Sequence, residues 1–221
     1  MPIALISNST ATSGLNATTT AGIDTTGADL LIIALCCDDA YNDTVTDSKG
    51  NTWTQLTSYT QTNVRVRMWY SIPTSVGTAH TFTAPGVLFV GTMLAAAFSG
   101  AAQTTPNDQQ SGANGFVSTL QPGSITPSED NELIWTHFGI NSAGSPISID
   151  SGFTELGEAD FGPADHYGGS FAYKIQTTAA AVNPTWTRTN TNGCACTQVS
   201  FKFATAVTGG VKPTLLLMGV G

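Results

Sequence analysis

The sequence contains few charged residues. Asp, Glu, Lys and Arg make up 10% of its 221 residues, whereas they make up about 25% of an ordinary soluble domain. Lys and Arg number only seven, they form no cluster, and the formal net charge is −8. Sequence-independent binding to phosphates depends on clustered basic side chains. We therefore expect no direct binding to nucleic acid.

Long apolar runs are also missing. The apolar run LLIIALCC at residues 30–37 is far shorter than the ~18 residues that indicate a membrane span. The opening residues MPIALISNSTATSG lack the basic region and the apolar core of a signal peptide. We expect a soluble protein that is made in the cytoplasm without Sec-type export and that has no membrane partner.

Catalytic motifs are absent from the sequence as well. No GxSxG, HExxH or phosphate-binding glycine loop occurs. One segment, EADFGPADHYGG, places Asp160, Asp165 and His166 together, whereas His137 is expected to pack within a strand. We name no catalytic residue and expect neither an enzyme nor a cofactor. A hydrolase that uses the loop from Asp160 to His166 is the alternative.

The four cysteines give only a weak metal signal. Neighbouring residues of a strand point to opposite faces, and neither cysteine pair has CxxC spacing. Free buried thiols are the first interpretation, while a disulfide between the pairs and a metal site stay open. The cysteines are Cys36, Cys37, Cys194 and Cys196.

An acidic run follows the first cysteine pair. Oxygen-rich loops can bind calcium, but the spacing of an EF-hand is absent here. An Asp before Gly-Asn is ordinary turn chemistry, so we predict a turn and no metal site. The acidic residues are Asp38, Asp39, Asp43 and Asp47.

An internal repeat organises the rest of the chain. Several segments match others about 100 residues later, and the offset drifts by single residues, as loop insertions would cause. The repeat predicts two related halves, near residues 28–102 and 130–203. The matching pairs are DLLII with NELIW, NTWTQL with SGFTEL, YSIPT with YKIQT, and TFT with TWT.

Each half has the pattern of short strands separated by turn residues, without a helical apolar period. We predict an all-β fold, namely a two-sheet antiparallel β-sandwich that is jelly-roll-like and is built from interleaved halves. The sandwich spans residues 1–204, and an extended C-terminal arm follows at residues 205–221. Two consecutive small sandwiches are the alternative.

Two strands are apolar at every position, at residues 30–35 and 93–98. A strand of this kind is usually buried on both faces. In a two-sheet sandwich its outer face needs cover, from a loop or from a neighbouring subunit, and both interpretations stay open.

The segment VRVRMWY at residues 64–70 alternates instead. Alternation places Val64, Val66, Met68 and Tyr70 on the inner face, and in the second half it places Phe171, Tyr173 and Ile175 there. Arg65, Arg67 and Trp69 then lie on the opposite, solvent-exposed face of the strand, which we call the wet face. An exposed Trp between guanidinium groups can stack on a sugar ring or anchor a protein interface. We favour a Trp that shields its own sheet, beside solvated arginines, over this binding role.

The segment GGVKPTLLLMGVG at residues 209–221 has the composition of an apolar strand. Exposed apolar strand material promotes aggregation, so it needs a partner surface. We predict that it adds a strand to a partner or fills a partner's groove; folding back onto its own chain is the alternative. The predicted contact residues are Val211, Pro213, Leu215, Leu216, Leu217 and Met218.

The pattern ADLLIIAL…TDSKGNTWTQL…VRMWYSI…HTFTA…MLAAAFSGA, together with this tail, resembles the β-sandwich virion proteins of tailed bacteriophages. The resemblance implies a non-enzymatic protein of the virion, foremost a decoration or cement protein on the outside of the head. Its partners would be copies of itself, the major capsid protein or another virion protein.

The same resemblance also fits a receptor- or glycan-binding tail or spike component, and related sandwiches occur in carbohydrate-binding modules. A host surface glycan would then be the partner. The family supplies no residue-level motif, and fold alone does not determine function.

Overall fold

The computed structural model describes residues 2–12, 17–38, 40, 44–86, 91–141, 147–159 and 167–204, and this part of the chain is all-β. Its first half contains nine strands: β1 (Ala4–Thr12), β2 (Ala17–Thr19), β3 (Leu30–Cys37), β4 (Thr46–Asp47), β5 (Thr54–Gln55), β6 (Tyr59–Gln61), β7 (Val64–Ser71), β8 (Phe82–Pro85) and β9 (Thr92–Ser99). The second half contains eight: β10 (Asn107–Phe116), β11 (Thr119–Leu120), β12 (Glu132–Asn141), β13 (Ile147–Ile149), β14 (Thr154–Ala159), β15 (Tyr167–Gln176), β16 (Trp186–Arg188) and β17 (Gly193–Phe201). Within the described residues, no helix could cross a membrane.

The strands form four antiparallel sheets, two in each half. In the first half a large sheet has the order β1-β9-β3-β7-β5, with β6 also on β7, and a small sheet has the order β2-β8-β4. In the second half the orders are β10-β17-β12-β15-β14 and β11-β16-β13. When β6 is set aside, both halves place their strands 1-8-3-6-5 in one sheet and 2-7-4 in the other. This connectivity is that of a jelly roll.

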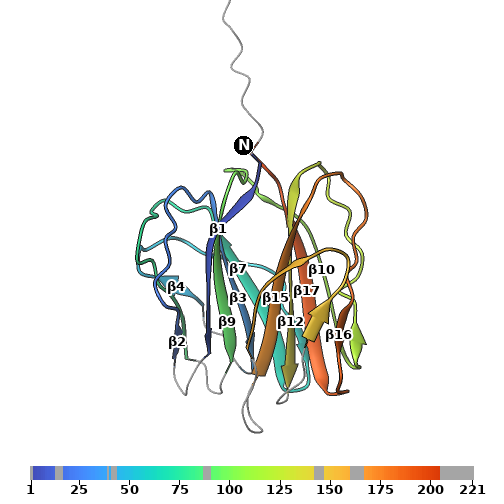
Figure 1. Ribbon diagram of the computed structural model, residues 1–221. Helices are drawn as coiled ribbons and strands as arrows, with labels where there is room; N and C mark the ends of the chain where they lie inside the picture. The colour runs from blue at the N-terminus through green and yellow to red at the C-terminus, as the bar shows by residue number, and fades with distance from the viewer. Residues whose placement is uncertain are drawn as a thin grey trace, which may run out of the picture.

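The sheets stack as four layers (Figure 1). The two large sheets face each other across a central core, and each small sheet covers the outer face of its own large sheet. The prediction of an all-β sandwich is therefore confirmed. The described residues differ from the predicted two-sheet arrangement in forming four layers, because each half closes its own jelly roll and the two rolls then pack together.

Strand β3 explains why some strands are apolar on both faces. Leu30 and Ile32 point into the central core, whereas Leu31 and Ile33 point into the outer core beneath the small sheet. Strand β9 alternates between the same two cores. The cover thus comes from the chain's own sheets, and neither a loop nor a neighbouring subunit is needed.

The inner-face predictions hold for all of the predicted residues except Val64, which is buried but is not part of the central core. Val66, Met68 and Tyr70 of β7 contact the central core, and so do Phe171, Tyr173 and Ile175 of β15.

Small residues allow the large sheets to approach closely near Cys36. A Cβ atom on Gly169 would lie 2.3 Å from the Cys36 Sγ, and one on Gly139 would lie 2.8 Å from a Val66 methyl carbon. Real Cβ atoms do not approach this closely, so the glycines leave the space that the Cys36 side chain fills. The Cys36 thiol donates to the Phe138 carbonyl across the interface at 3.4 Å.

Candidate functional site

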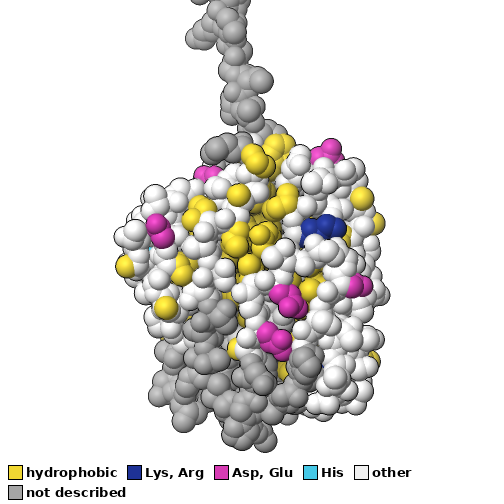
Figure 2. Space-filling model, viewed as in Figure 1, with side chains coloured by type: hydrophobic (Ala, Val, Ile, Leu, Met, Phe, Trp, Pro, Cys, Tyr) yellow, Lys and Arg dark blue, Asp and Glu magenta, His cyan; other side chains and the backbone are white. Residues whose placement is uncertain are grey.

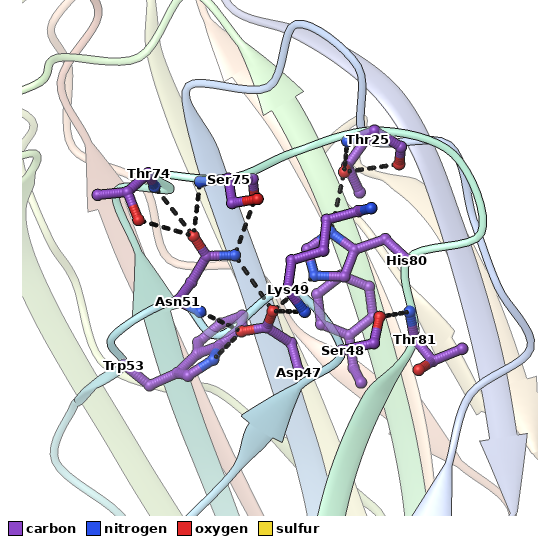
Figure 3. Close-up of polar contacts among 12 residues, drawn as sticks. Thr25, Asp47, Ser48, Lys49, Asn51, Trp53, Thr74, Ser75, His80 and Thr81 are labelled. Carbon is purple, nitrogen blue, oxygen red and sulfur yellow. Dashed lines mark hydrogen bonds and ion pairs between the residues drawn. The ribbon is translucent and has the colours of Figure 1, made fainter.

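A histidine–carboxylate pair lies in the outer layer of the first half, where Asp47 ends β4 and His80 precedes β8. His80 Nε2 and Asp47 Oδ1 are 2.8 Å apart, and both side chains are fully shielded from solvent. Figure 3 shows the pair among the loops that flank the small sheet. It is the described pairing that most resembles acid–base chemistry, so we consider it first.

Asp47 accepts hydrogen bonds from several donors at once. The amides of Lys49 and Asn51 donate at 2.8 and 3.1 Å, the Asn51 side chain at 3.2 Å and Trp53 Nε1 at 2.8 Å. Bonds from an Asp to amides a few residues ahead are typical of an Asx turn, and Gly50 adopts the left-handed conformation (φ +75°) that this turn needs. Asn51 extends the network, because its Oδ1 accepts from the Ser75 amide at 3.0 Å.

His80 joins this turn to the loop that precedes β3. Its Nε2 is hydrogen-bonded to Asp47 Oδ1 at 2.8 Å, and its Nδ1 is hydrogen-bonded to Thr25 Oγ1 at 2.9 Å. The ring also stacks on Phe82 with the centroids 4.4 Å apart. Thr25 Oγ1 in turn accepts from the Gly77 amide at 3.0 Å.

The order hydroxyl–imidazole–carboxylate is that of a catalytic triad, but the surroundings favour a structural role. Thr25 and His80 are 0% exposed, and the Thr25 hydroxyl is already engaged by His80 and Gly77. A nucleophile must reach its substrate. We conclude that the cluster ties three loops to the small sheet.

The second half lacks this polar cluster. Asp47 pairs with Phe82, and the equivalent ladder pairs Ile149 with Trp186. His80 forms an isolated bridge with Ile23, and the equivalent bridge joins Val182 to Ile125. Counted from Phe82 and from Trp186, Ile149 stands at the position of Asp47 and Pro184 at that of His80, so both positions are apolar in the second half. Comparing the repeat copies position by position is the signal that could have identified Asp47 and His80 from the sequence.

The Asp47 network makes stability depend on pH. Burial raises the pKa of Asp47, but hydrogen bonds from His80, the Lys49 amide and Trp53 outweigh burial, so the pKa lies below its ordinary value of 3.8. A carboxyl with a depressed pKa stabilises the fold above its unfolded-state pKa, and this contribution is lost as the pH falls through the folded-state value. We expect the melting temperature to fall more steeply below pH 3.8 in the wild type than in Asp47→Asn.

Thermal melts of both proteins from about pH 6 to pH 2 would measure this difference, because all other carboxyl groups contribute equally to the two curves. If the two curves were parallel, ionisation of Asp47 would make no contribution to the stability of the fold.

The predicted wet face is buried at two of its three positions. Trp69 is 1% exposed and Arg67 is 4% exposed, because the outer face of β7 lies beneath the small sheet. The Arg67 guanidinium lies 4.6 Å from the centroid of the Trp69 ring and donates to Gln55 Oε1 at 3.1 Å. Arg65 is half-buried and donates to Thr60 Oγ1 at 2.9 Å. The prediction of a wet face is wrong for Trp69 and Arg67.

All four cysteines are free and buried. Cys36 belongs to the central core and Cys37 to the outer core, as strand alternation requires. Burial raises the pKa of the Cys36 and Cys196 thiols well above the ordinary value, so these thiols are poor nucleophiles. Among the described residues, no group of three or more His, Cys, Asp or Glu side chains could hold a metal ion.

His137 has the packing role that the sequence predicts. It is fully buried, it stacks on Phe171 with the centroids 5.8 Å apart, and its Nδ1 accepts from Trp135 Nε1 at 3.4 Å. Burial lowers the pKa of His137 to about 3, so the ring is neutral.

Several predicted residues lie outside the described part of the chain. They are Asp39 and Asp43 of the acidic run, Asp160, Asp165 and His166 of the alternative hydrolase loop, and Val211, Pro213, Leu215, Leu216, Leu217 and Met218 of the tail.

An apolar seam marks the edge where the two halves meet at β1, β14 and β15. Its side chains are half-buried and pack against the rim of the central core. Figure 2 shows apolar side chains gathered between the halves, in the upper part of the view. The seam consists of Leu5, Leu156, Tyr173, Ile175 and Phe203. Because such a surface can take an apolar partner, it is the candidate interaction site.

Comparison with protein-family models, with curated proteins and with solved structures finds no match to this chain.

Proposed function

We propose that this chain is a non-enzymatic structural protein of a tailed-phage particle, foremost a decoration or cement protein on the outside of the head. The observation that carries the proposal is the apolar seam on the rim of a four-layer sandwich. A half-buried apolar surface favours contact with another polypeptide over turnover of a small substrate. The sequence resemblance to phage virion proteins supports the same role.

The fold suits a repeated contact in a shell. Both jelly rolls bury their large sheets on two faces, so contacts with neighbours would use the sheet edges, the loops and the outer faces of the small sheets. A single contact through a small seam is weak, but many contacts on one shell act together. The partners are copies of this chain, the major capsid protein or another virion protein.

The receptor- or glycan-binding alternative depended on an exposed Trp69, which is buried. The hydrolase alternative depends on the loop from Asp160 to His166, which lies outside the described residues. Neither alternative gains an observation from the fold.

The sequence predicts that the C-terminal segment contacts a partner in the particle. Deletion of residues 211–221 from the phage gene therefore tests the proposal. All described strands lie within residues 4–201, so the shortened protein should keep its melting temperature while it disappears from purified particles. Phe116→Ser is the matched control, because Phe116 is 61% exposed and lies away from the seam; this variant should be incorporated normally. Shortened protein on particles at normal copy number would overturn the assignment.

A further inference from the structure

A lysine and two acidic residues lie at one edge of the large sheet of the second half. Strands β10, β17 and β12 are antiparallel neighbours in that order, so the start of β10, the end of β17 and the start of β12 meet at the same edge. This edge carries Asp108 of β10, Glu132 of β12 and Lys202, which directly follows β17. Lys202 Nζ lies 3.4 Å from Asp108 Oδ1.

Ser128 bridges the two acidic side chains. Its amide donates to Asp108 Oδ2 at 2.8 Å, and its hydroxyl donates to Glu132 Oε1 at 3.4 Å. The Asp108 side chain is 7% exposed, and Glu132 is 0% exposed. Two carboxyl groups are thus close neighbours in a shielded place, and Lys202 contacts the other oxygen of Asp108.

The two carboxyl groups differ in how firmly they hold a proton. Burial raises the pKa of Glu132 above its ordinary value of 4.5, and the neighbouring charge of Asp108 adds to the rise. Burial also raises the pKa of Asp108, but hydrogen bonds from Ser128 and Lys202 outweigh burial, so this pKa lies below its ordinary value of 3.8. Glu132 Oε2 is a buried oxygen that, within the described ranges, receives no hydrogen bond of good geometry. Carboxyl groups whose pKa values are pushed apart divide the roles of acid and base between them.

The backbone fixes the positions of Asp108 and Lys202. The register of β10 on β17 shifts between Asn107 and Gln110, so Asp108 stands in a β-bulge, a feature that re-aims a side chain. The Lys202 amide donates to the Pro106 carbonyl at 2.8 Å. Backbone pairing therefore holds both residues in place, and the four-carbon stem of the lysine supplies the reach.

The first half has a serine, Ser99, where the second half has Lys202. The correspondence follows from the ladder pairs that precede these two residues, Leu30–Phe98 and Leu133–Phe201. A serine offers no amine, so the first half forms the same strand order without this contact. The jelly roll therefore does not require the pairing of a lysine with a carboxylate at this edge.

Condensation of the amine with the carboxyl group is the chemistry that this arrangement supports. A carbon–oxygen bond is about 1.2 Å long, so Asp108 Cγ lies at most about 4.6 Å from Lys202 Nζ. Reactants held together in one molecule have an effective concentration far above that in solution, which favours their reaction.

The step balances without a further reactant. Transfer of a proton from the ammonium to the carboxylate gives a neutral amine and a neutral acid. The Nζ–Cγ bond then forms and one Cγ–oxygen bond breaks, so that an amide and one water molecule result. Glu132 gives its proton to the leaving oxygen and takes the proton that the nitrogen loses, which is general acid–base catalysis. Glu132 is therefore unchanged at the end.

We propose that Lys202 and Asp108 condense in the folded protein to an intramolecular isopeptide bond, with Glu132 as the general acid and base. The bond ties the first strand of the second half, β10, to the residue after its last strand, β17. It forms once in each molecule and is not turnover of a substrate. This inference goes beyond the proposed function and uses none of the residues of the apolar seam.

Mass spectrometry of the purified, denatured full-length protein tests the bond. We expect a mass below that of the sequence by one water molecule, and a peptide from its digest that contains both Lys202 and Asp108. Lys202→Arg keeps the charge, but a guanidinium stays protonated, so this variant should have its full mass. Lys174→Arg is the matched control, because Lys174 donates to the Ser151 carbonyl; it should keep the deficit. The full sequence mass in the wild type would overturn the proposal.

Glu132→Gln tests the role of the acid. Glutamine has a similar volume but no acidic proton, so the bond should form at least a hundredfold more slowly and most of the freshly purified variant should have its full mass. Circular dichroism and a cooperative melt would establish that the variant is folded. A wild-type rate in the folded variant would contradict the role of Glu132. Because no particle is used, these results are independent of the test of virion incorporation.

Discussion

Trp69→Ala is expected to lower the free energy of unfolding by about 3–5 kcal/mol, the usual cost of removing a large buried aromatic side chain. Trp69 is 1% exposed and belongs to the apolar core between the large and small sheets of the first half. Its removal would leave a cavity there and would take away the ring that faces the Arg67 guanidinium. Denaturant unfolding would measure this loss of stability, and we expect the dependence of the free energy of unfolding on denaturant concentration to stay the same.

Phe116→Ala is the control for this experiment. It removes an aromatic ring that is 61% exposed, so we expect a change within about 0.5 kcal/mol. If Trp69→Ala lowered the free energy of unfolding no more than the control does, the outer face of β7 would be open to solvent. This is the arrangement that the alternating sequence pattern predicts.

Asp47→Ala is expected to destabilise the first half by about 1–3 kcal/mol, since removing the carboxylate leaves the buried His80 ring nitrogen without its hydrogen-bond partner. The substitution also leaves Trp53 Nε1 and the backbone amides of Lys49 and Asn51 without their hydrogen-bond acceptor. Hydrogen exchange should accelerate in β4 and β8 and remain unchanged in β13 and β16 of the other half.

The second half supplies a matched rescue. Ile149 occupies the position of Asp47 there, and Pro184, two residues before Trp186, occupies that of His80. Replacing both partners of a buried hydrogen bond with apolar residues can be nearly neutral, so Asp47→Ile with His80→Val should cost less than Asp47→Ile alone. Additive losses from the two substitutions would indicate that the pair does not act as a unit.

Much of the fold follows from local patterns. The repeat near an offset of 100 residues reflects two jelly rolls with the same strand order, and strand alternation places Phe171, Tyr173 and Ile175 correctly in the central core. The number of layers does not follow from such patterns. A period of two residues tells which side chains share a face, but it does not tell which sheet covers that face.

Trp69 illustrates this limit. Its neighbours Arg65 and Arg67 give β7 the alternating pattern of a strand with one solvent-exposed face. In the structure, that face is covered by short strands that are distant in the sequence, namely β2, β4 and β8. The same holds for Asp47 and His80, which are 33 residues apart and meet because β4 pairs with β8. Contacts of this kind are set by topology, which a single sequence expresses only indirectly.

The central claim is that this protein is a built-in part of a phage particle. Its most direct test is quantitative mass spectrometry of gradient-purified particles of a tailed phage whose genome carries this sequence. We predict that the protein migrates with the particles at a fixed ratio to the major capsid protein, and that the ratio survives repeated washing. Its presence in the infected-cell lysate together with its absence from the purified particles would contradict the claim.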